Sequence, residues 1–240
     1  MINMKVIIND KYEYLKSFIE AVPSLFKEQG ELVYQARNQL KTYQVDGVDV
    51  IVKSFKKPHW FNRVVYTFFR PSKAKRSYEY ALRLLDAGVR TPEPIAYMEE
   101  KESGFLCHSY FVSIYEKDYT HLRDYMTGEI MDESLLREIA RFIADFHNKG
   151  FYHLDMSPGN ILHKKEGDRH LFSLVDNNRM LFKKNLSKKD RYKSFQRLSY
   201  QPEVIAVFAT EYASICGLDP EEAVKMIKKY SSEFFHKEIK

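Results

Sequence analysis

The chain has 240 residues, of which 44% are hydrophobic and 30% are charged, and its formal net charge is +5. This composition is typical of a globular chain and excludes a disordered one, and the length suits one large domain or two lobes. No apolar run approaches the ~20 residues of a membrane span and the N-terminus lacks the apolar core of a secretory signal, so we expect a cytoplasmic protein without a transmembrane segment.

The N-terminal part has the pattern of a strand, a helix and a hairpin. Val6-Ile7-Ile8 is a short strand candidate, and apolar residues recur at helical spacing over residues 11–27. Pro23 is expected to kink or end that helix early. Asp46-Gly47 between two apolar runs predicts a β-hairpin, whose second strand is Val48–Lys53.

A lysine closes this strand, and a glutamate lies in the next helical pattern. Lys53 follows Val50-Ile51-Val52, and the helix expected over Lys73–Asp86 carries Glu79. In phosphoryl transfer a lysine binds the α- and β-phosphates of the nucleotide, and a helix-borne glutamate holds its ammonium group. We predict these catalytic roles for Lys53 and Glu79. The alternative is that both are ordinary surface charges.

The loop that would cover the nucleotide phosphates has no glycine-rich motif. Protein kinases carry G-x-G-x-x-G between their first two strands, whereas this chain has Gln35-Ala36-Arg37-Asn38-Gln39. The backbone amides of a turn can hold phosphate without glycines, and an arginine adds positive charge. Arg37 and Asn38 are therefore the candidate nucleotide-binding residues of this turn.

Segment 56–76 is dense in aromatic and basic residues. Its aromatic members are Trp60, Phe61, Tyr66, Phe68 and Phe69, and its basic members are Lys56, Lys57, Arg63, Arg70, Lys73, Lys75 and Arg76. One interpretation is a core-packing segment with a basic rim. The other is a surface that contacts an anionic amphiphile or membrane, because aromatic side chains favour the bilayer interface and clustered Lys and Arg favour anionic head groups.

The pattern changes from strands to helices near residue 116. Residues 95–98 and 105–115 are expected to pair across the polar turn 99–104, and Glu116-Lys117-Asp118 is polar. We expect an N-terminal lobe of residues 1–116 and a C-terminal lobe of residues 117–240, with Glu116 at a hinge that contacts the adenine ring. The predicted class is α+β: a small N-terminal antiparallel sheet lobe with one key helix, and a mainly helical C-terminal lobe.

An amphipathic helix leads into the motif that follows. Residues 135–148 place their apolar side chains on one side, and Gly150 is a plausible C-cap. From the boundary to this point we expect only helices. His147 is expected to be a packed helix residue and not a ligand.

The stretch from Tyr152 to Met180 carries the strongest signal. His153, Asp155 and Asn160 form the pattern H-x-D-x-x-x-x-N, and the apolar run 171–175 ends at Asp176. This order predicts two short strands that each present a polar group at one end. It matches the kinase catalytic loop, with leucine in place of arginine at position 154.

Phosphoryl transfer requires groups of this kind. A carboxylate orients the acceptor hydroxyl and takes its proton, while an Asn and an Asp hold the metal ions that bridge the nucleotide phosphates. Asp155 is the candidate base, His153 a further catalytic candidate, and Asn160 and Asp176 the candidate metal ligands. Taken singly, each could instead be a core histidine or a turn former.

The remaining chain has helix patterns around residues 191–208 and 220–236. No Ala-Pro-Glu motif follows Asp176, so a long phosphorylated switch loop is not expected. The two cysteines, Cys107 and Cys216, lie far apart and outside any CxxC or His-rich stretch. We expect two buried thiols, with neither a disulfide framework nor a zinc site.

Lys53, Glu79, the loop from His153 to Asn160, and Asp176 together resemble the protein-kinase-like superfamily. The sequence also contains four shorter motifs: Arg37-Asn38, the run from Gly88 to Pro94, Ser157-Pro158-Gly159-Asn160 and Val175-Asp176-Asn177-Asn178-Arg179-Met180. These motifs are similar to those of the bacterial lipopolysaccharide kinase (Kdo/WaaP) family, and the resemblance covers roughly Gly30 to Met180.

The resemblance implies a two-lobed protein-kinase-like fold, ATP and Mg²⁺ as cofactors, and a sugar hydroxyl of the lipopolysaccharide inner core, Kdo or heptose, as acceptor of the γ-phosphate. A sugar embedded in a lipid requires docking at the membrane surface, and the basic residues that flank Trp60–Phe69, with those after Met180, could supply the attraction to an anionic membrane. The protein would then be peripheral on the inner face of the cytoplasmic membrane. Asn177-Asn178 stand where protein kinases have Phe-Gly, and Leu154 removes the usual partner of an activation-loop phosphate. We therefore expect a constitutively assembled site.

Other functions remain open at this point. The same fold could act on a small metabolite, an antibiotic or a protein side chain, or it could be a nucleotide-binding pseudokinase that serves as a scaffold. A basic nucleic-acid binder is a weaker alternative, because no recognition motif accompanies the modest positive charge. We expect no nucleic-acid partner.

Overall fold

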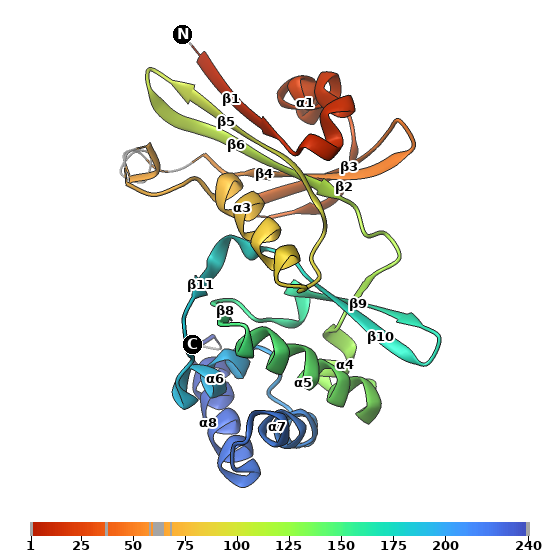
Figure 1. Cartoon of the computed structure of the whole chain (residues 1–240), viewed down its shortest axis with the longest axis vertical. Coiled ribbons are helices and arrows are strands. Elements are labelled where there is room, and N and C mark those ends of the chain that lie inside the picture. The colour runs from red at the N-terminus through yellow and green to blue at the C-terminus, as the bar shows by residue number, and fades with distance from the viewer. Residues whose placement is uncertain (1, 37, 58, 60–64, 68, 239–240) are drawn as a thin grey trace. The chain divides into compact units, whose positions relative to one another are not determined.

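The computed structural model describes residues 2–36, 38–57, 59, 65–67 and 69–238. The chain divides into two compact units, Met1–Lys117 and Asp118–Lys240, one residue from the predicted boundary (Figure 1). The predictions made for Arg37 and for Trp60, Phe61, Arg63 and Phe68 fall outside the described residues. Within the described ranges no helix is long and apolar enough to cross a membrane.

The first unit is built on one antiparallel sheet, in the strand order β1-β5-β6-β4-β3-β2. Its elements are β1 (Ile2–Ile8), the 3₁₀ helix η1 (Asp10–Leu15), α1 (Lys16–Glu28), β2 (Glu31–Gln35), β3 (Asn38–Val45), β4 (Val48–Phe55), α3 (Lys73–Asp86), β5 (Pro94–Glu102) and β6 (Phe105–Ile114).

Two turns show how local sequence sets the sheet. The predicted hairpin turn at Asp46-Gly47 joins β3 to β4, and both residues have positive φ, 49° and 77°, as a tight two-residue hairpin turn requires. The turn between β5 and β6 is shorter than the predicted 99–104. Pairing continues to Glu102, and Ser103-Gly104 alone make the turn.

The helices α1 and α3 cover opposite faces of the sheet. Val50 and Val52 of β4 belong to the cluster that α1 completes, whereas Phe55 packs with Ala74 and Tyr78 of α3. Because side chains alternate along a strand, Lys53 lies on the same face of β4 as Phe55. The strand therefore presents Lys53 on the side of the sheet that α3 covers.

The expected early end of the first helix at Pro23 is wrong. α1 continues to Glu28, with Val22, Pro23 and Phe26 buried. Proline removes one backbone hydrogen bond from the helix, but burial of the neighbouring side chains against the sheet offsets that loss.

The second unit holds the helices and several short strands. Its elements are β7 (Thr120–His121), α4 (Arg123–Thr127), α5 (Glu133–Asn148), β8 (Phe151–His153), the 3₁₀ helix η2 (Pro158–Asn160), β9 (Ile161–Glu166), β10 (Arg169–Leu174), the 3₁₀ helix η3 (Asn177–Arg179), β11 (Met180–Phe182), α6 (Lys188–Ser194), the 3₁₀ helix η4 (Phe195–Arg197), α7 (Pro202–Cys216) and α8 (Pro220–Glu238).

Two sequence expectations for this unit are corrected. The stretch between the boundary and residue 151 is not only helical, because β7 pairs with β9 through His121 and Leu162. The helix pattern around 191–208 is broken into α6, η4 and α7. Pro202 begins a new helix at N1, where its fixed φ is favourable and its missing N–H removes no bond.

His147 is buried in the second unit and packs against its neighbours, as expected. Its Nδ1 is 2.7 Å from the Tyr212 hydroxyl oxygen and its Nε2 is 3.0 Å from the Ser194 hydroxyl oxygen. The rings of Phe195 and Tyr212 pack on it edge-on. Burial lowers the pKa of His147 to about 3, because the charged imidazolium would lose its hydration.

The cysteines meet their expectation in part. Both are free thiols; Cys107 is buried, but Cys216 is only half-buried, at the end of α7. The Cys216 Sγ accepts a hydrogen bond from Arg191 Nη1 at 3.4 Å.

We predict that His147 makes stability depend on acidity. The unfolded histidine gains its proton as pH falls below 6.5, whereas the folded one stays neutral until about pH 3, so stability is complete above pH 6.5 and declines below it. At pH 5 the loss is about 2 kcal/mol from this residue. Urea unfolding of the wild type and His147→Gln between pH 5 and 8 measures it; equal pH slopes for the two chains would contradict the assignment.

Gly150 generates a second prediction. Its φ is +82°, and a Cβ at this position would overlap the carbonyl oxygen of Lys183. Gly150→Ala should lower the free energy of unfolding by about 3 kcal/mol, from left-handed strain plus overlap. Gly167→Ala is the matched control: its φ is +61° with open space around it, so it should lose only about 1–2 kcal/mol. Denaturant midpoints compare them, and equal losses would show that the Lys183 approach has no effect.

Candidate active site

Two short strands bring the ends of the predicted motif together. β8 ends at His153 and pairs with β11, so that His153 lies opposite Met180. The Leu154 N–H donates to the Arg179 carbonyl at 2.9 Å. The loop that begins after His153 and the turn that follows Asp176 are thus held side by side.

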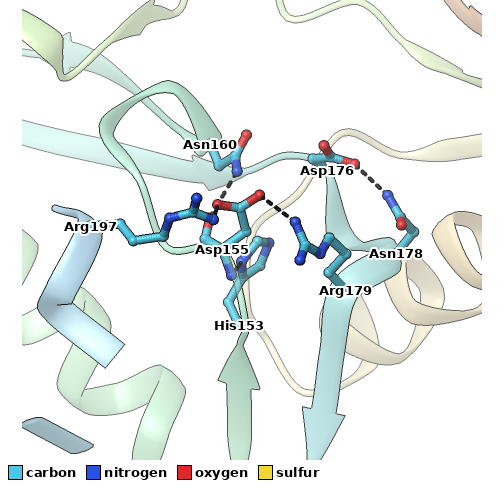
Figure 2. A network of polar contacts seen from close by, with 7 residues as sticks. All are labelled: His153, Asp155, Asn160, Asp176, Asn178, Arg179 and Arg197. Atoms are coloured by element: carbon cyan, nitrogen blue, oxygen red, sulfur yellow. Dashed lines mark hydrogen bonds and ion pairs between the residues drawn. The ribbon is translucent and has the colours of Figure 1, made fainter. Parts of the chain in front are cut away.

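Asp155 is fixed through its backbone. Its N–H donates to His153 Nδ1 at 3.0 Å, and its carbonyl oxygen accepts from Asn160 Nδ2 at 2.8 Å. The backbone carbonyl of Asn160 in turn accepts from the Val175 N–H at 3.0 Å, one residue before Asp176. Hydrogen bonds therefore join His153, Asp155 and Asn160, and tie Asn160 to the residue that precedes Asp176. Figure 2 shows the side chains of these residues, with Asp176 bonded to Asn178.

The Asp155 carboxylate contacts two arginines. Arg179 Nη1 donates to Oδ2 at 3.1 Å, and Arg197 Nη1 donates to Oδ1 (Figure 2). The side chain of Asp155 is 20% exposed. A carboxylate offers about four lone-pair sites, so one arginine on each oxygen leaves acceptor capacity on both.

Sequence reasoning missed both arginine contacts. Arg179 lies in the run that carries the family resemblance, but no role was assigned to it. Arg197 lies 42 residues from Asp155, in a 3₁₀ helix, and no motif spacing connects the two. A signal for it exists only in the tertiary structure.

Asn160 and Asp176 carry the oxygen atoms suited to a divalent cation. The Asn160 amide donates its Nδ2 to Asp155, which leaves Oδ1 as its candidate ligand atom. Asp176 has a left-handed backbone, φ 58°, and its Oδ1 accepts from Asn178 Nδ2. Left-handed φ is uncommon for residues other than glycine but is tolerated by aspartate. Carboxylate and amide oxygens are ligands that Mg²⁺ accepts.

His153 is buried and acts on the loop through hydrogen bonding. Burial lowers the pKa of its imidazole, while the carboxylates of Asp176 and Asp155 oppose that shift. Because Nδ1 accepts the Asp155 N–H, the neutral ring carries its proton on Nε2. This geometry suits a residue that orients the loop, and a direct catalytic role stays a prediction.

In the first unit the structure places Lys53 and Glu79 on neighbouring elements. Lys53 pairs with Phe111 across β4 and β6, and Phe111 packs against the cluster that α3 completes. The Lys53 Nζ lies 5.4 Å from the centre of the Phe55 ring. Glu79 makes an ion pair with Lys75, whose Nζ lies 3.6 Å from Oε1. The predicted pairing of Glu79 with Lys53 stays a prediction.

Asn38 and Glu116 are the other predicted nucleotide-binding residues that the structure describes. Asn38 begins β3, and its carbonyl accepts from the Ala36 N–H at 3.1 Å. Glu116 is half-buried and follows the end of β6. Their contacts with a nucleotide stay predictions.

One of the basic residues predicted to lie on the surface of segment 56–76 is buried. Arg76 is 4% exposed, with its guanidinium 5.9 Å from the centre of the Tyr66 ring, and burial lowers its pKa. Phe69, by contrast, is 81% exposed. Arg76 therefore belongs to the packing of α3 and not to a docking surface.

A separate group of three ligand-type side chains lies on the β5–β6 hairpin. Atoms of Glu100, Cys107 and His108 lie within 4.8 Å of one another. A register shift after Glu100 explains it, since a bulge brings neighbouring side chains to one face. The Cys107 thiol donates to the Glu100 carbonyl at 3.2 Å, so the hairpin itself engages it.

Comparison with known proteins gives a family and a fold. Residues 29–215 match the model of the lipopolysaccharide kinase (Kdo/WaaP) family. The structure is similar to that of WaaP in complex with acyl carrier protein, with a TM-score of 0.65 and 17% identity over 95% of this chain and 98% of that chain. A double mutant of the Mycobacterium tuberculosis PknI kinase domain gives 0.47 and 12% identity, over 83% and 93%. No curated protein matches the sequence. The likeness to WaaP confirms the predicted α+β, two-lobed, kinase-like fold.

Proposed function

The chain belongs to the lipopolysaccharide kinase (Kdo/WaaP) family, and from this premise we propose that it transfers the γ-phosphate of ATP to a sugar hydroxyl of the lipopolysaccharide inner core. The observation that supports the reaction is the hydrogen-bonded network of Asp155, Asn160 and the turn at Asp176. A carboxylate, an amide oxygen and a second carboxylate are the groups that phosphoryl transfer requires, and their occurrence on these connected segments supports the proposal.

In the proposed reaction Asp155 accepts a hydrogen bond from the acceptor hydroxyl. As the hydroxyl oxygen forms its bond to the γ-phosphorus, the bond from that phosphorus to the leaving ADP oxygen breaks. The hydroxyl proton passes to Asp155. The lone pairs that Arg179 and Arg197 leave on the carboxylate are sufficient for this contact.

Asn160 Oδ1 and Asp176 would hold Mg²⁺. Mg²⁺ is usually bound by one or two protein oxygens, with waters and phosphate oxygens in its other positions, and this pair of side chains fits that requirement. When bound, the ion neutralises charge on the phosphates. In the first unit, Lys53 would bind the α- and β-phosphates with Glu79 as its orienting partner, and the turn around Arg37 and Asn38 and the Glu116 backbone would add contacts to the nucleotide.

The identity of the acceptor is the more specific part of the proposal. Kdo and heptose are the sugars that the family name and the sequence resemblance suggest, and the alternative acceptors are a small metabolite, an antibiotic or a protein side chain. Docking on an anionic surface would rest on the exposed Phe69 and on basic residues such as Lys56 and Arg70. Each basic residue near such a surface would contribute about 1 kcal/mol.

We predict transfer of labelled phosphate from ATP to purified core-truncated lipopolysaccharides that end in Kdo or heptose. Asp155→Asn should lower kcat about 10²–10⁴-fold with the KM for ATP nearly unchanged, because a general base acts in the transition state. A generic protein and an aminoglycoside serve as control acceptors. Transfer to a control acceptor with none to the glycolipids would show that the proposed acceptor is wrong. Full activity of Asp155→Asn would show that Asp155 is not the base.

Nucleotide and metal titrations test the remaining roles. Lys53→Ala should lower kcat/KM for ATP on the order of 100-fold, and Asp176→Asn should raise the Mg²⁺ concentration needed for half-maximal rate, because each change removes charge stabilisation of the phosphates. Lys41→Ala is the matched control, since Lys41 lies on the neighbouring strand opposite Val52, on the face that α1 covers. If ATP and Mg²⁺ curves match those of the wild type, these assignments are wrong.

A further inference from the structure

Arg197 is the more firmly held of the two arginines on Asp155. Its side chain is 26% exposed, against 53% for Arg179. Its guanidinium carbon lies 4.6 Å from the centre of the Phe234 ring, a cation–π distance. One side of Arg197 is thus bonded to Asp155, and the other is packed on an aromatic ring of α8.

The ring that supports Arg197 lies outside the region that defines the family. The family model matches residues 29–215, which include Arg197, whereas Phe234 is in α8. α8 packs along η4 and α7, and Phe195 of η4 stacks on Phe208 of α7. The C-terminal helix therefore contacts the residue that binds the Asp155 carboxylate of the catalytic loop.

The orientation of a carboxylate needs such support. Rotation about the last side-chain bond of aspartate is a broad sp³–sp² torsion, so packing alone defines its plane weakly. An arginine on each oxygen restricts that rotation, and Arg197 restricts it more because its own position is packed. A displacement of about 1 Å at a catalytic group can lower the rate on the order of 100-fold.

We propose that Arg197 is a positioning residue that sets the orientation of the Asp155 carboxylate, and that Phe234 of the C-terminal helix holds Arg197 in place. The inference rests on the proposed phosphotransfer at Asp155. Arg197 itself acts through Asp155 and transfers no proton. The segment beyond the family match then contributes to turnover indirectly, through Arg197.

The test is a kinetic series on the full chain with Arg197→Gln, Arg197→Lys, Phe234→Leu and Phe235→Leu. Arg197→Gln should lower kcat on the order of 100-fold with the KM for ATP within about twofold, because misorientation affects the transition state and not nucleotide binding. Arg197→Lys should recover part of the rate, since it keeps the charge and loses the planar fork. Phe234→Leu should lower kcat about tenfold, the effect of a displacement smaller than that of losing the guanidinium.

Phe235 is the comparison, because it is the next residue of α8 and its ring packs on Tyr200, 5.2 Å between centres, and edge-on against Phe234, 5.3 Å between centres. Since Phe234 itself carries the cation–π contact with Arg197, Phe235→Leu should lower kcat less than Phe234→Leu does. The double variant Arg197→Gln/Phe234→Leu should be no slower than Arg197→Gln, since Phe234 acts only through Arg197. A wild-type kcat for Arg197→Gln would overturn the proposal. So would a double variant whose fold-loss in kcat equals the product of the two single losses.

Urea unfolding separates this inference from the proposed function. If the wild type transfers phosphate to no acceptor, the proposed function fails, yet the contact can still be measured through Asp155→Asn, Arg197→Gln and the double variant. Interacting residues shift the urea midpoint non-additively, whereas independent ones add. Non-additive shifts support the positioning contact, and additive shifts overturn it.

Discussion

The hydrogen bond from Asn160 Nδ2 to the Asp155 carbonyl is the constraint on which the candidate site depends. It closes the loop between β8 and β9, and it turns the Asn160 amide oxygen away from the backbone. The Asn160 carbonyl then accepts from Val175, so the same residue also aligns the strand that leads to Asp176. A single residue, itself a proposed metal ligand, thereby connects the proposed base to the strand that carries the second proposed ligand.

Charge in this region is arranged around Asp155. Arg179 and Arg197 approach different oxygens of one carboxylate, and the Oδ1 of Asp176 accepts a hydrogen bond from the Asn178 amide. Two cations thus face Asp155, whereas Asp176 has a neutral amide among its contacts.

Local sequence patterns predicted much of the fold. The helix over Lys73–Asp86 was predicted with both ends correct, because Ser72 caps its first turn and the apolar period is regular. Asp46-Gly47 predicted its hairpin from turn chemistry alone. The two-residue strand β7 was missed because so short a segment has no period to detect. α1 passes Pro23 because tertiary packing outweighs a local breaker.

In the candidate site, too, some features could be predicted from the sequence and others could not. Asp155, Asn160 and Asp176 could be found from their spacing, since a loop and a hairpin set the distances between them. Arg197 could not, because only the packing of the helices brings η4 to the loop. The relation of Lys53 to Glu79 was read from an analogy of position, and the face of β4 on which Lys53 lies supports it without testing the pair.

The turn after Asp176 has a consequence for control of the protein. η3 begins at the next residue, and β11 follows at once, with its backbone bonded to β8 through residues Met180 to Phe182. Under the proposed function, the backbone that many signalling kinases leave free for a covalent switch is here part of the folded structure. Such an enzyme would need no covalent change in this segment to complete its site.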